Sequence, residues 1–343
     1  MKANQKSKKK AVDRVSKQFS EIMIKAIGLV KEDWTKPWLP VRKKGTFIPQ
    51  NLEGRIYKGG NMLMLLFYSM LSGYTIPVFF TLKKANSVNL KIKENAVSFP
   101  VYYFFKHVVH RITKDSIKYE DYCRLSEKEQ DEYYVYPNMR YYNVFNIEQS
   151  NFAEVAPEKY RDLQTRFQNQ FEEGENLLKV PEIDEMLAGE SWICPIHILP
   201  SDRAFFSPKE DKIVCPLKEQ FKEEFNFYST LLHEMTHSTG TEERLNRKMG
   251  KTFGDPDYAK EELVAELTAA FTSFILGISS SIKTENVSYL RSWLEDMKKE
   301  PSFIMDVLAD VVAAFNFISE ELGIDLSNVE TASIDEFETL LAA

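Results

Sequence analysis

Residues 233–237 read His233-Glu234-Met235-Thr236-His237, inside a segment (225–238) whose apolar residues recur with helical spacing. On a helix, positions i and i+4 share a face, so the two imidazoles can bind one Zn²⁺ ion. Glu234 follows the first imidazole directly, where it can act as general base for a water molecule at the metal. The H-E-x-x-H pattern therefore predicts a metallopeptidase site with Glu234 as its catalytic residue.

A catalytic zinc site needs a third protein ligand and one open position for water. The segment 258–276 has one apolar helical face, and its first turns carry Glu261, Glu262 and Glu266 about twenty residues after His237. Any of the three carboxylates can supply the ligand if this helix folds back on the first. We favour Glu262 as ligand and Glu266 as the acceptor of a ligand imidazole N–H, with the reverse assignment left open.

Two other residues are secondary candidates for the site. Tyr258 precedes the carboxylate helix and is a possible hydrogen-bond donor to an oxyanion, although capping or packing is its plainer role. Arg244 is expected to pair with a nearby acid. The three remaining histidines stand apart from the motif among apolar or basic neighbours, so they are poor candidates for ligands: His107, His110 and His197.

Charge is divided unevenly along the chain. Residues 1–150 hold 26 Lys and Arg against 14 Asp and Glu, a net charge of +12, whereas residues 151–343 hold 18 against 37, a net charge of −19. The overall pI of about 5.5 therefore conceals a basic half. A basic half favours an anionic polymer as partner, while the metal-binding pattern lies in the acidic half.

The basic half is also rich in aromatic residues. A basic groove for phosphates and flat side chains on which bases stack are the two features that bind single-stranded nucleic acid without sequence preference. An ordinary solvated face and an aromatic core would have a similar composition. The predicted DNA contacts are Trp38, Arg42, Lys43, Lys44, Arg55, Tyr57, Lys58, Asn61, Lys83 and Lys84.

Cysteine usage and the N-terminus indicate a cytoplasmic location. Cys123, Cys194 and Cys215 are odd in number and widely spaced, which fits a reducing compartment and offers no zinc knuckle. The lysine-rich N-terminus leads into an amphipathic stretch and contains no secretory apolar region.

One uncharged stretch, 59–82, is long enough to cross a membrane. Asn61, Gly73 and Pro77 are among the residues that interrupt it. We therefore interpret it as a buried helix over 61–72, a turn and a strand over 78–82, and we expect no membrane partner.

Motifs in both halves resemble those of the antirestriction proteins of the ArdC type. The first half carries motifs similar to the N-terminal single-stranded-DNA-binding domain of that family, namely Lys36-Pro37-Trp38, Pro49-Gln50-Asn51, Tyr57-x-Gly59-Gly60-Asn61, Tyr74-x-x-Pro77 and Asn143-Val144-Phe145-Asn146. The second half looks like the zincin-type metallopeptidase domain in Tyr228-x-Thr230-Leu231-x-His233-Glu234-x-x-His237-x-Thr239-Gly240, Arg244-Leu245, Phe253-Gly254-Asp255, Tyr258-Ala259 and Glu261-Glu262-Leu263-x-Ala265-Glu266. The segments Phe79-Phe80-Thr81-Leu82-Lys83-Lys84 and 90–95 depart from the family pattern, which affects the DNA contacts and leaves the metal residues intact.

The resemblance implies an α+β protein of two domains, a basic mixed α/β domain that binds single-stranded DNA and a mostly helical zincin-like domain. The expected limits are a basic flexible tail (1–18), the DNA-binding domain (19–155), a partly helical linker (156–190), the metallopeptidase domain (191–325) and a C-terminal tail (326–343).

The resemblance also implies that the protein travels on a mobile genetic element and protects incoming DNA from host restriction. Its partners would be single-stranded DNA and a DNA-associated protein as peptidase substrate. The alternative is a non-catalytic protein that coats single-stranded DNA and keeps a structural or vestigial metal site. A stand-alone protease with an inhibitory N-terminal domain would leave the net charge of +12 in residues 1–150 unexplained.

Overall fold

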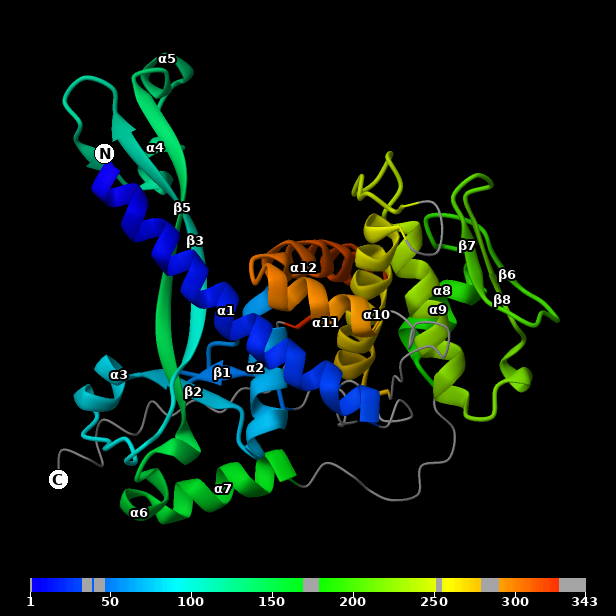
Figure 1. The fold of residues 1–343 in the computed structure, drawn as a ribbon, viewed down its shortest axis with the longest axis horizontal. Helices are drawn as coiled ribbons and strands as arrows, with labels where there is room; N and C mark the ends of the chain where they lie inside the picture. Colours follow the sequence, from blue (N-terminus) through cyan, green and yellow to red (C-terminus); the bar gives the residue numbers. More distant parts are fainter. Residues whose placement is uncertain are drawn as a thin grey trace.

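The computed structural model describes residues 2–32, 39, 47–168, 179–250, 255–278 and 290–326 (Figure 1). The first half runs through α1 (Lys2–Glu32), β1 (Gln50–Asn51), α2 (Gly59–Ser72), β2 (Val78–Thr81), α3 (Leu82–Ser87), β3 (Phe99–His110), β4 (Ser116–Ile117), α4 (Tyr119–Tyr122), α5 (Glu127–Gln130), β5 (Tyr133–Asn146), the short 3-10 helix η1 (Ile147–Gln149), α6 (Phe152–Val155) and α7 (Pro157–Gln168). The second half runs through α8 (Pro181–Ala188), β6 (Ile196–Ile198), β7 (Phe205–Ser207), β8 (Lys212–Cys215), η2 (Lys218–Gln220), α9 (Glu224–Ser238), α10 (Pro256–Leu276), α11 (Leu290–Lys299) and α12 (Phe303–Glu321). This architecture confirms the predicted α+β class.

The sheet of the first half has the strand order β1-β2-β5-β3-β4. Its longest strands, β3 and β5, pair antiparallel along the whole of β3, with Phe99 opposite Val144 and His110 opposite Tyr133. Both strands are rich in aromatic and β-branched residues, which favour extended backbone. In Figure 1 the hairpin of β3 and β5 extends well beyond the short strands β1 and β2 and carries α4 and α5 at its far end.

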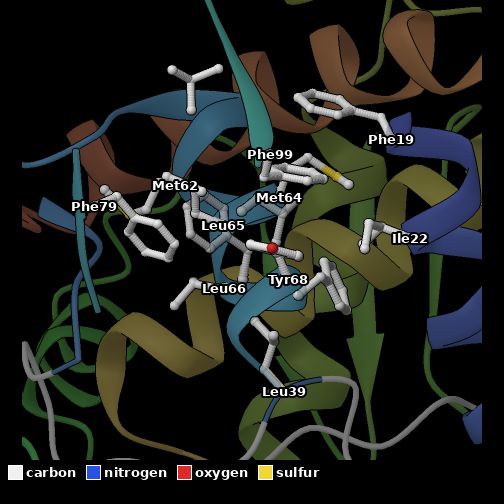
Figure 2. Close-up of a cluster of buried hydrophobic side chains, with 14 of the residues drawn as sticks. Phe19, Ile22, Leu39, Met62, Met64, Leu65, Leu66, Tyr68, Phe79 and Phe99 are labelled. Atoms are coloured by element: carbon white, nitrogen blue, oxygen red, sulfur yellow. The ribbon is translucent and has the colours of Figure 1, made fainter. Parts of the chain in front are cut away.

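Helix α1 contradicts the predicted flexible tail over residues 1–18. One helix spans Lys2–Glu32, and Val15, Phe19 and Met23 are fully buried at intervals of four residues. The ring of Phe19 stacks on Phe99 of β3 with centroids 5.4 Å apart (Figure 2). The lysine-rich composition suggested a solvated chain, but the apolar residues at helical spacing gain more by burial against the sheet.

The uncharged stretch forms a helix, a turn and a strand, which confirms the sequence interpretation. Helix α2 ends at Gly73, whose φ of 70° lies in the left-handed region and whose N–H bonds to the carbonyls of Ser69 and Met70. Among the described residues, no single helix has both the length and the apolar content needed to cross a membrane, although Ser292–Lys299 and Phe303–Glu321, bent by 119°, meet those two criteria as a pair.

The second half packs helices on a small sheet with the order β6-β8-β7. Strands β6 and β8 are parallel, and β7 pairs antiparallel with β8 as an edge strand. Helix α9 contacts β7 and β8 on one side and α10 on another. The edge strand β7 therefore lies beside the helix that carries the H-E-x-x-H pattern.

Helices α10 and α12 join the two halves through shared apolar cores. Leu263 and Phe271 of α10 and Leu308 of α12 belong to the cluster that also contains Phe19 and Phe99 of the first half. Ala269, Leu276 and Ile318 of the same two helices belong to the second cluster, around α9 and the small sheet. Since α10 is buried on nearly every side, it is a core helix for both halves.

The burial of α1 predicts a stability effect inside the segment that the sequence suggested was a tail. Val15→Ala removes two methyl groups from a fully buried side chain and should lower the free energy of unfolding by about 2 kcal/mol. Lys17→Ala, at an exposed position of the same helix, is the matched control and should change it by less than about 0.5 kcal/mol. Chemical denaturation measures both, and equal stability of the two variants would show that this part of α1 does not pack on the protein.

Candidate metal centre

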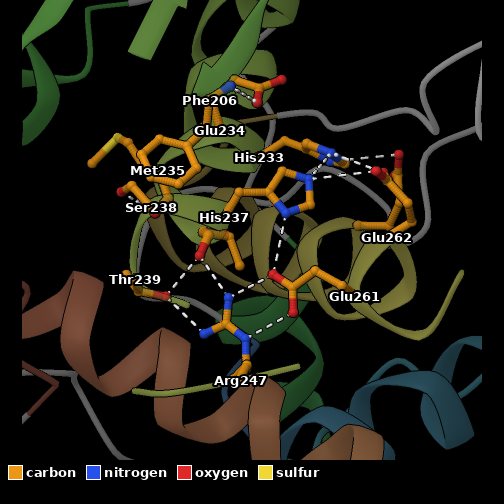
Figure 3. A network of polar contacts seen from close by, with 12 residues as sticks. Phe206, His233, Glu234, Met235, His237, Ser238, Thr239, Arg247, Glu261 and Glu262 are labelled. Atoms are coloured by element: carbon orange, nitrogen blue, oxygen red, sulfur yellow. Dashed lines mark hydrogen bonds and ion pairs between the residues drawn. The ribbon is translucent and has the colours of Figure 1, made fainter. Parts of the chain in front are cut away.

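Helix α9 buries His233 and Glu234 and leaves His237 partly buried. His233 and Glu234 are each 3% exposed, and the Nε2 atoms of His233 and His237 lie 3.1 Å apart. Figure 3 shows both imidazoles turned toward Glu262 of the neighbouring helix. The i, i+4 spacing thus brings two imidazole nitrogens to one point, as the sequence pattern predicts.

Helix α10 brings three buried carboxylates against α9. Its start is defined by Asp255, whose side chain accepts from the N–H of Asp257, and by Pro256 in the first turn. Oε2 of Glu262 lies 3.4 Å from Nε2 of His233, and Oε1 lies 3.7 Å from Nε2 of His237. The chain does fold back as expected, and Glu262 faces both Nε2 atoms.

The donor set fits a divalent metal ion. One ligand atom from each of His233, His237 and Glu262 can be chosen so that all lie within 4.8 Å of one another. Two ligands at tetrahedral positions about 2.0–2.1 Å from Zn²⁺ are roughly 3.3 Å apart, close to the observed separations of 3.1, 3.4 and 3.7 Å. Buried carboxylates are costly without a compensating charge, and a dication among them would supply it.

Two more carboxylates lie behind the imidazoles, one for each ring. Oε1 of Glu266 is 3.6 Å from Nδ1 of His233, slightly longer than a hydrogen bond. Oε1 of Glu261 is 3.1 Å from Nδ1 of His237. Carboxylates in these positions fix the orientation of a ligand imidazole and raise its basicity.

Arg247 holds Glu261 in place, a role that the sequence analysis missed. Its Nη2 and Nε atoms lie 2.7 and 2.9 Å from the two carboxylate oxygens, and further N–H groups donate to Thr239 Oγ1 and the carbonyl of Thr236 (Figure 3). A Cβ at Gly240 would come within 2.8 Å of this guanidinium. The glycine after α9 therefore allows Arg247 to approach closely, and only the folded loop reveals this relation.

Glu234 points toward the edge strand β7. Its Oε2 accepts a 2.9 Å hydrogen bond from the backbone N–H of Phe206 (Figure 3). The strand has no sequence signal for this contact, because any residue at position 206 would offer the same N–H. The hydrogen bond fixes the direction of the carboxylate beside the metal ligands.

The charges within the cluster shift the pKa values of its members. Burial alone lowers the pKa of His237, but hydrogen bonds and ion pairs with Glu261 and Glu262 outweigh it and raise that pKa to about 10. Burial raises the pKa of Glu262, yet the imidazoles of His233 and His237 hold it well below its usual range. In the metal-free protein these contacts favour the protonated form of His237, so metal and proton compete for this imidazole.

The secondary candidates have structural contacts. Arg244 pairs with Asp211 through distances of 2.6 and 2.8 Å and also donates to the carbonyls of Ser238 and Ile193, so its expected pairing with an acid is confirmed. Tyr258 lies in the first turn of α10 and packs on the core of the first half. Its role as an oxyanion donor stays a prediction.

Six of the ten predicted DNA contacts lie among the described residues. Trp38, Arg42, Lys43 and Lys44 lie outside the described residues. Arg55, Lys58 and Lys83 are exposed, and the first two line a cavity of about 620 Å³ together with residues of α12.

Three further predicted contacts have partners inside the domain. Tyr57 meets the ring of Phe79 edge-on at 6.4 Å, and burial raises its pKa. The amide of Asn61 exchanges two hydrogen bonds with the backbone of Tyr102, and Lys84 lies 2.9 Å from Glu53. Tyr57 and Asn61 thus contact strands β2 and β3, and Lys84 pairs with Glu53 in the turn after β1.

Replacing Glu262 and Glu266 by Gln, one at a time, tests which of the two carboxylates is the third metal ligand. Glu266→Gln should weaken zinc binding by about 10–100-fold, because it changes only the orientation of His233. Glu262→Gln should weaken it further, because it removes a ligand. Competition titration against a chelator measures both affinities, and the opposite order would make Glu266 the ligand.

Proton release tests the charge of the metal-free site. The pKa of His237 is raised above its ordinary 6.5, so its proton stabilises the metal-free protein below about pH 6.5, and this stabilisation is lost as the pH rises to about 10. Zinc binding at pH 7 should displace about one proton from His237. Calorimetric titration in buffers of different ionisation enthalpy measures this, and a binding enthalpy independent of the buffer would contradict the assignment.

Comparisons with known proteins find relatives of both halves. The family model described as the N-terminal domain of the anti-restriction factor ArdC matches residues 13–145, and that of a zincin-like metallopeptidase matches residues 181–310. A DNA primase TraC from Escherichia coli is 29% identical over 309 residues, which are 88% of this chain and 26% of the primase. The chain spans about a quarter or less of the length of the TraC relatives that it matches.

Solved structures share the fold over most of the chain. The metal-free crystal structure of the antirestriction protein ArdC from the R388 plasmid matches with a TM-score of 0.61 at 23% identity, covering 89% of this chain and 97% of that one. The Mn(II)-bound structure of the same protein matches with a TM-score of 0.59 at 22% identity, covering 91% and 99%. With both domain models matched in this order, the chain belongs to the ArdC type, in which an N-terminal ArdC domain precedes a zincin-like metallopeptidase domain.

Proposed function

We propose that this chain is an antirestriction-type protein of a mobile genetic element that binds single-stranded DNA and carries a zinc-dependent peptidase site. It would act in the cytoplasm, where its three cysteines stay free thiols. The peptidase substrate would be a protein associated with the DNA. The observation that carries the proposal is the buried cluster of His233, His237 and Glu262, with Glu234 fixed beside it.

The donor set suits zinc. Two imidazoles and one carboxylate are the ligands of many catalytic zinc sites, and they leave one position open. A metal ion bound there supplies Lewis-acid polarisation of a water molecule and a peptide carbonyl.

The residues of the chain would then perform the proton transfers. Glu234 is the base that removes a proton from the attacking water and later returns it to the leaving amine. Phe206 N–H holds the carboxylate through one oxygen, and Arg247, through Glu261, holds the ring of His237. Tyr258 remains the proposed donor to the oxyanion.

DNA binding is proposed for the first half of the chain. Its net charge of +12 over residues 1–150 supports a polyanionic partner. The family match to the ArdC N-terminal domain and the similarity to a DNA primase support the same class of partner. Arg55, Lys58 and Lys83, which are exposed, stay as proposed phosphate contacts together with Arg42, Lys43 and Lys44.

Glu234→Gln separates catalysis from binding. The amide oxygen of Gln can still accept the hydrogen bond from Phe206, so folding, zinc uptake and affinity for single-stranded DNA should stay near wild type. Cleavage of a quenched-fluorescent peptide library should fall by about 10²–10⁴-fold, because the base is lost. Protection of plasmid DNA on transfer into a restricting host should fall with it.

The same assays identify the non-catalytic alternative. In that alternative the Glu234→Gln protein still protects plasmid DNA fully, whereas joint replacement of Arg42, Lys43 and Lys44 by Ala abolishes protection. This pair of results would assign the protective activity to DNA coating. Wild-type protein that binds single-stranded and duplex DNA equally at moderate salt would contradict the base-stacking part of the proposal.

A further inference from the structure

The β3–β5 hairpin exposes large aromatic side chains along its length. Tyr103 and Phe104 are 62% and 61% exposed, and Tyr134, Tyr136 and Tyr142 on the opposite strand are also exposed. Exposed apolar groups that adjoin one another usually mark an interaction site. Of these residues, none is among the contacts that the sequence analysis predicted.

The strand register sorts these residues onto two faces. Residues directly opposite each other in an antiparallel pair project to the same side. The pairs Val101–Tyr142, Tyr103–Arg140, Phe105–Asn138, His107–Tyr136 and Val109–Tyr134 therefore line one side, called here the aromatic face. Phe104 projects from the other side.

The rings of the aromatic face form a ladder. Tyr103 and Phe105 are stacked, with an interplanar angle of 6° and centroids 6.2 Å apart. The guanidinium of Arg140 lies over the ring of Phe105 at 4.6 Å. Farther along, Tyr134 and Tyr136 have centroids 5.8 Å apart, and both side chains are exposed.

The tip of the hairpin covers the other face. Helix α4 reaches it through Tyr122, whose ring meets Tyr133 at 6.1 Å, and through Tyr119, whose hydroxyl is 2.7 Å from Nζ of Lys106. Tyr133 and Lys106 both belong to the register positions of that other side. The aromatic face therefore keeps its exposure while the opposite side packs at the tip.

The charge of the two strands suits a polyanion. Neither β3 nor β5 contains Asp or Glu, whereas Arg140 supplies a cation on the aromatic face. Flat side chains with a cation among them, free of carboxylates, suit base stacking and phosphate contact with single-stranded nucleic acid. A duplex hides its base faces and cannot use such a ladder.

We infer that the aromatic face is the base-stacking platform of this protein for single-stranded DNA, with the exposed rings of Tyr103, Tyr136 and Tyr142 beneath bases. This inference rests on the proposed function and names the surface that performs it. Arg140 fixes one ring of the ladder and offers its remaining N–H groups to the phosphate backbone.

The neighbours Tyr103 and Phe104 provide a matched test, because they are equally exposed and lie on opposite faces. Fluorescence anisotropy with a labelled dT20 oligonucleotide should show affinity reduced roughly tenfold or more by Tyr103→Ala. Phe104→Ala should bind like wild type, and Tyr103→Trp should retain or improve binding. The salt dependence of Tyr103→Ala should equal that of wild type, because stacking releases no counterions.

The outcomes separate this inference from the proposed function. Wild-type protein that binds no dT20 would overturn both. Wild-type binding with Tyr103→Ala and Phe104→Ala equally unaffected, or equally impaired, would overturn the platform alone. A Tyr103→Ala protein that turns from dimer to monomer in sedimentation, with unchanged DNA affinity, would show that a second copy of the chain occupies the face.

Discussion

The buried charge between α9 and α10 is the constraint on which the rest of the structure depends. Glu234, Glu261, Glu262 and Glu266 are all nearly inaccessible to solvent, and carboxylates in that position require cations or hydrogen-bond donors. Arg247 forms an ion pair with Glu261, and the backbone N–H of Phe206 donates a hydrogen bond to Glu234. The imidazoles of His233 and His237 face Glu262. The loop after α9, the edge strand β7 and the start of α10 are each held in position by one of these contacts.

The same helix, α10, ties this site to the basic half of the chain. Its carboxylates face α9, while Leu263, Val264 and Phe271 enter the apolar core around α1, α2 and the large sheet. Helix α12 also contributes to both cores. A metallopeptidase-like site and a basic domain are thus built on shared helices.

Local patterns in the sequence predicted the local features of the structure. The H-E-x-x-H spacing, the carboxylate pair at 262 and 266 and the helix ending at Gly73 depend on helical periodicity and on one glycine, so the sequence contains them directly. The role of Arg247 and the contact of Glu234 with Phe206 depend on how a loop and an edge strand fold, and no local pattern records that. The lysine-rich composition suggested a tail, whereas α1 packs on the protein through Val15 and Phe19. The aromatic face of the hairpin can be recognised only from the strand register, which composition does not give.

X-ray absorption fine structure of the zinc-loaded protein tests the central claim most directly, because it reports the atoms bound to the metal. Ligation by His233, His237 and Glu262 predicts a shell of nitrogen and oxygen atoms at about 2.0–2.1 Å with the outer-shell scattering of two imidazoles. A sulfur shell at about 2.3 Å, or a spectrum without imidazole scattering, would place the metal elsewhere and contradict the site.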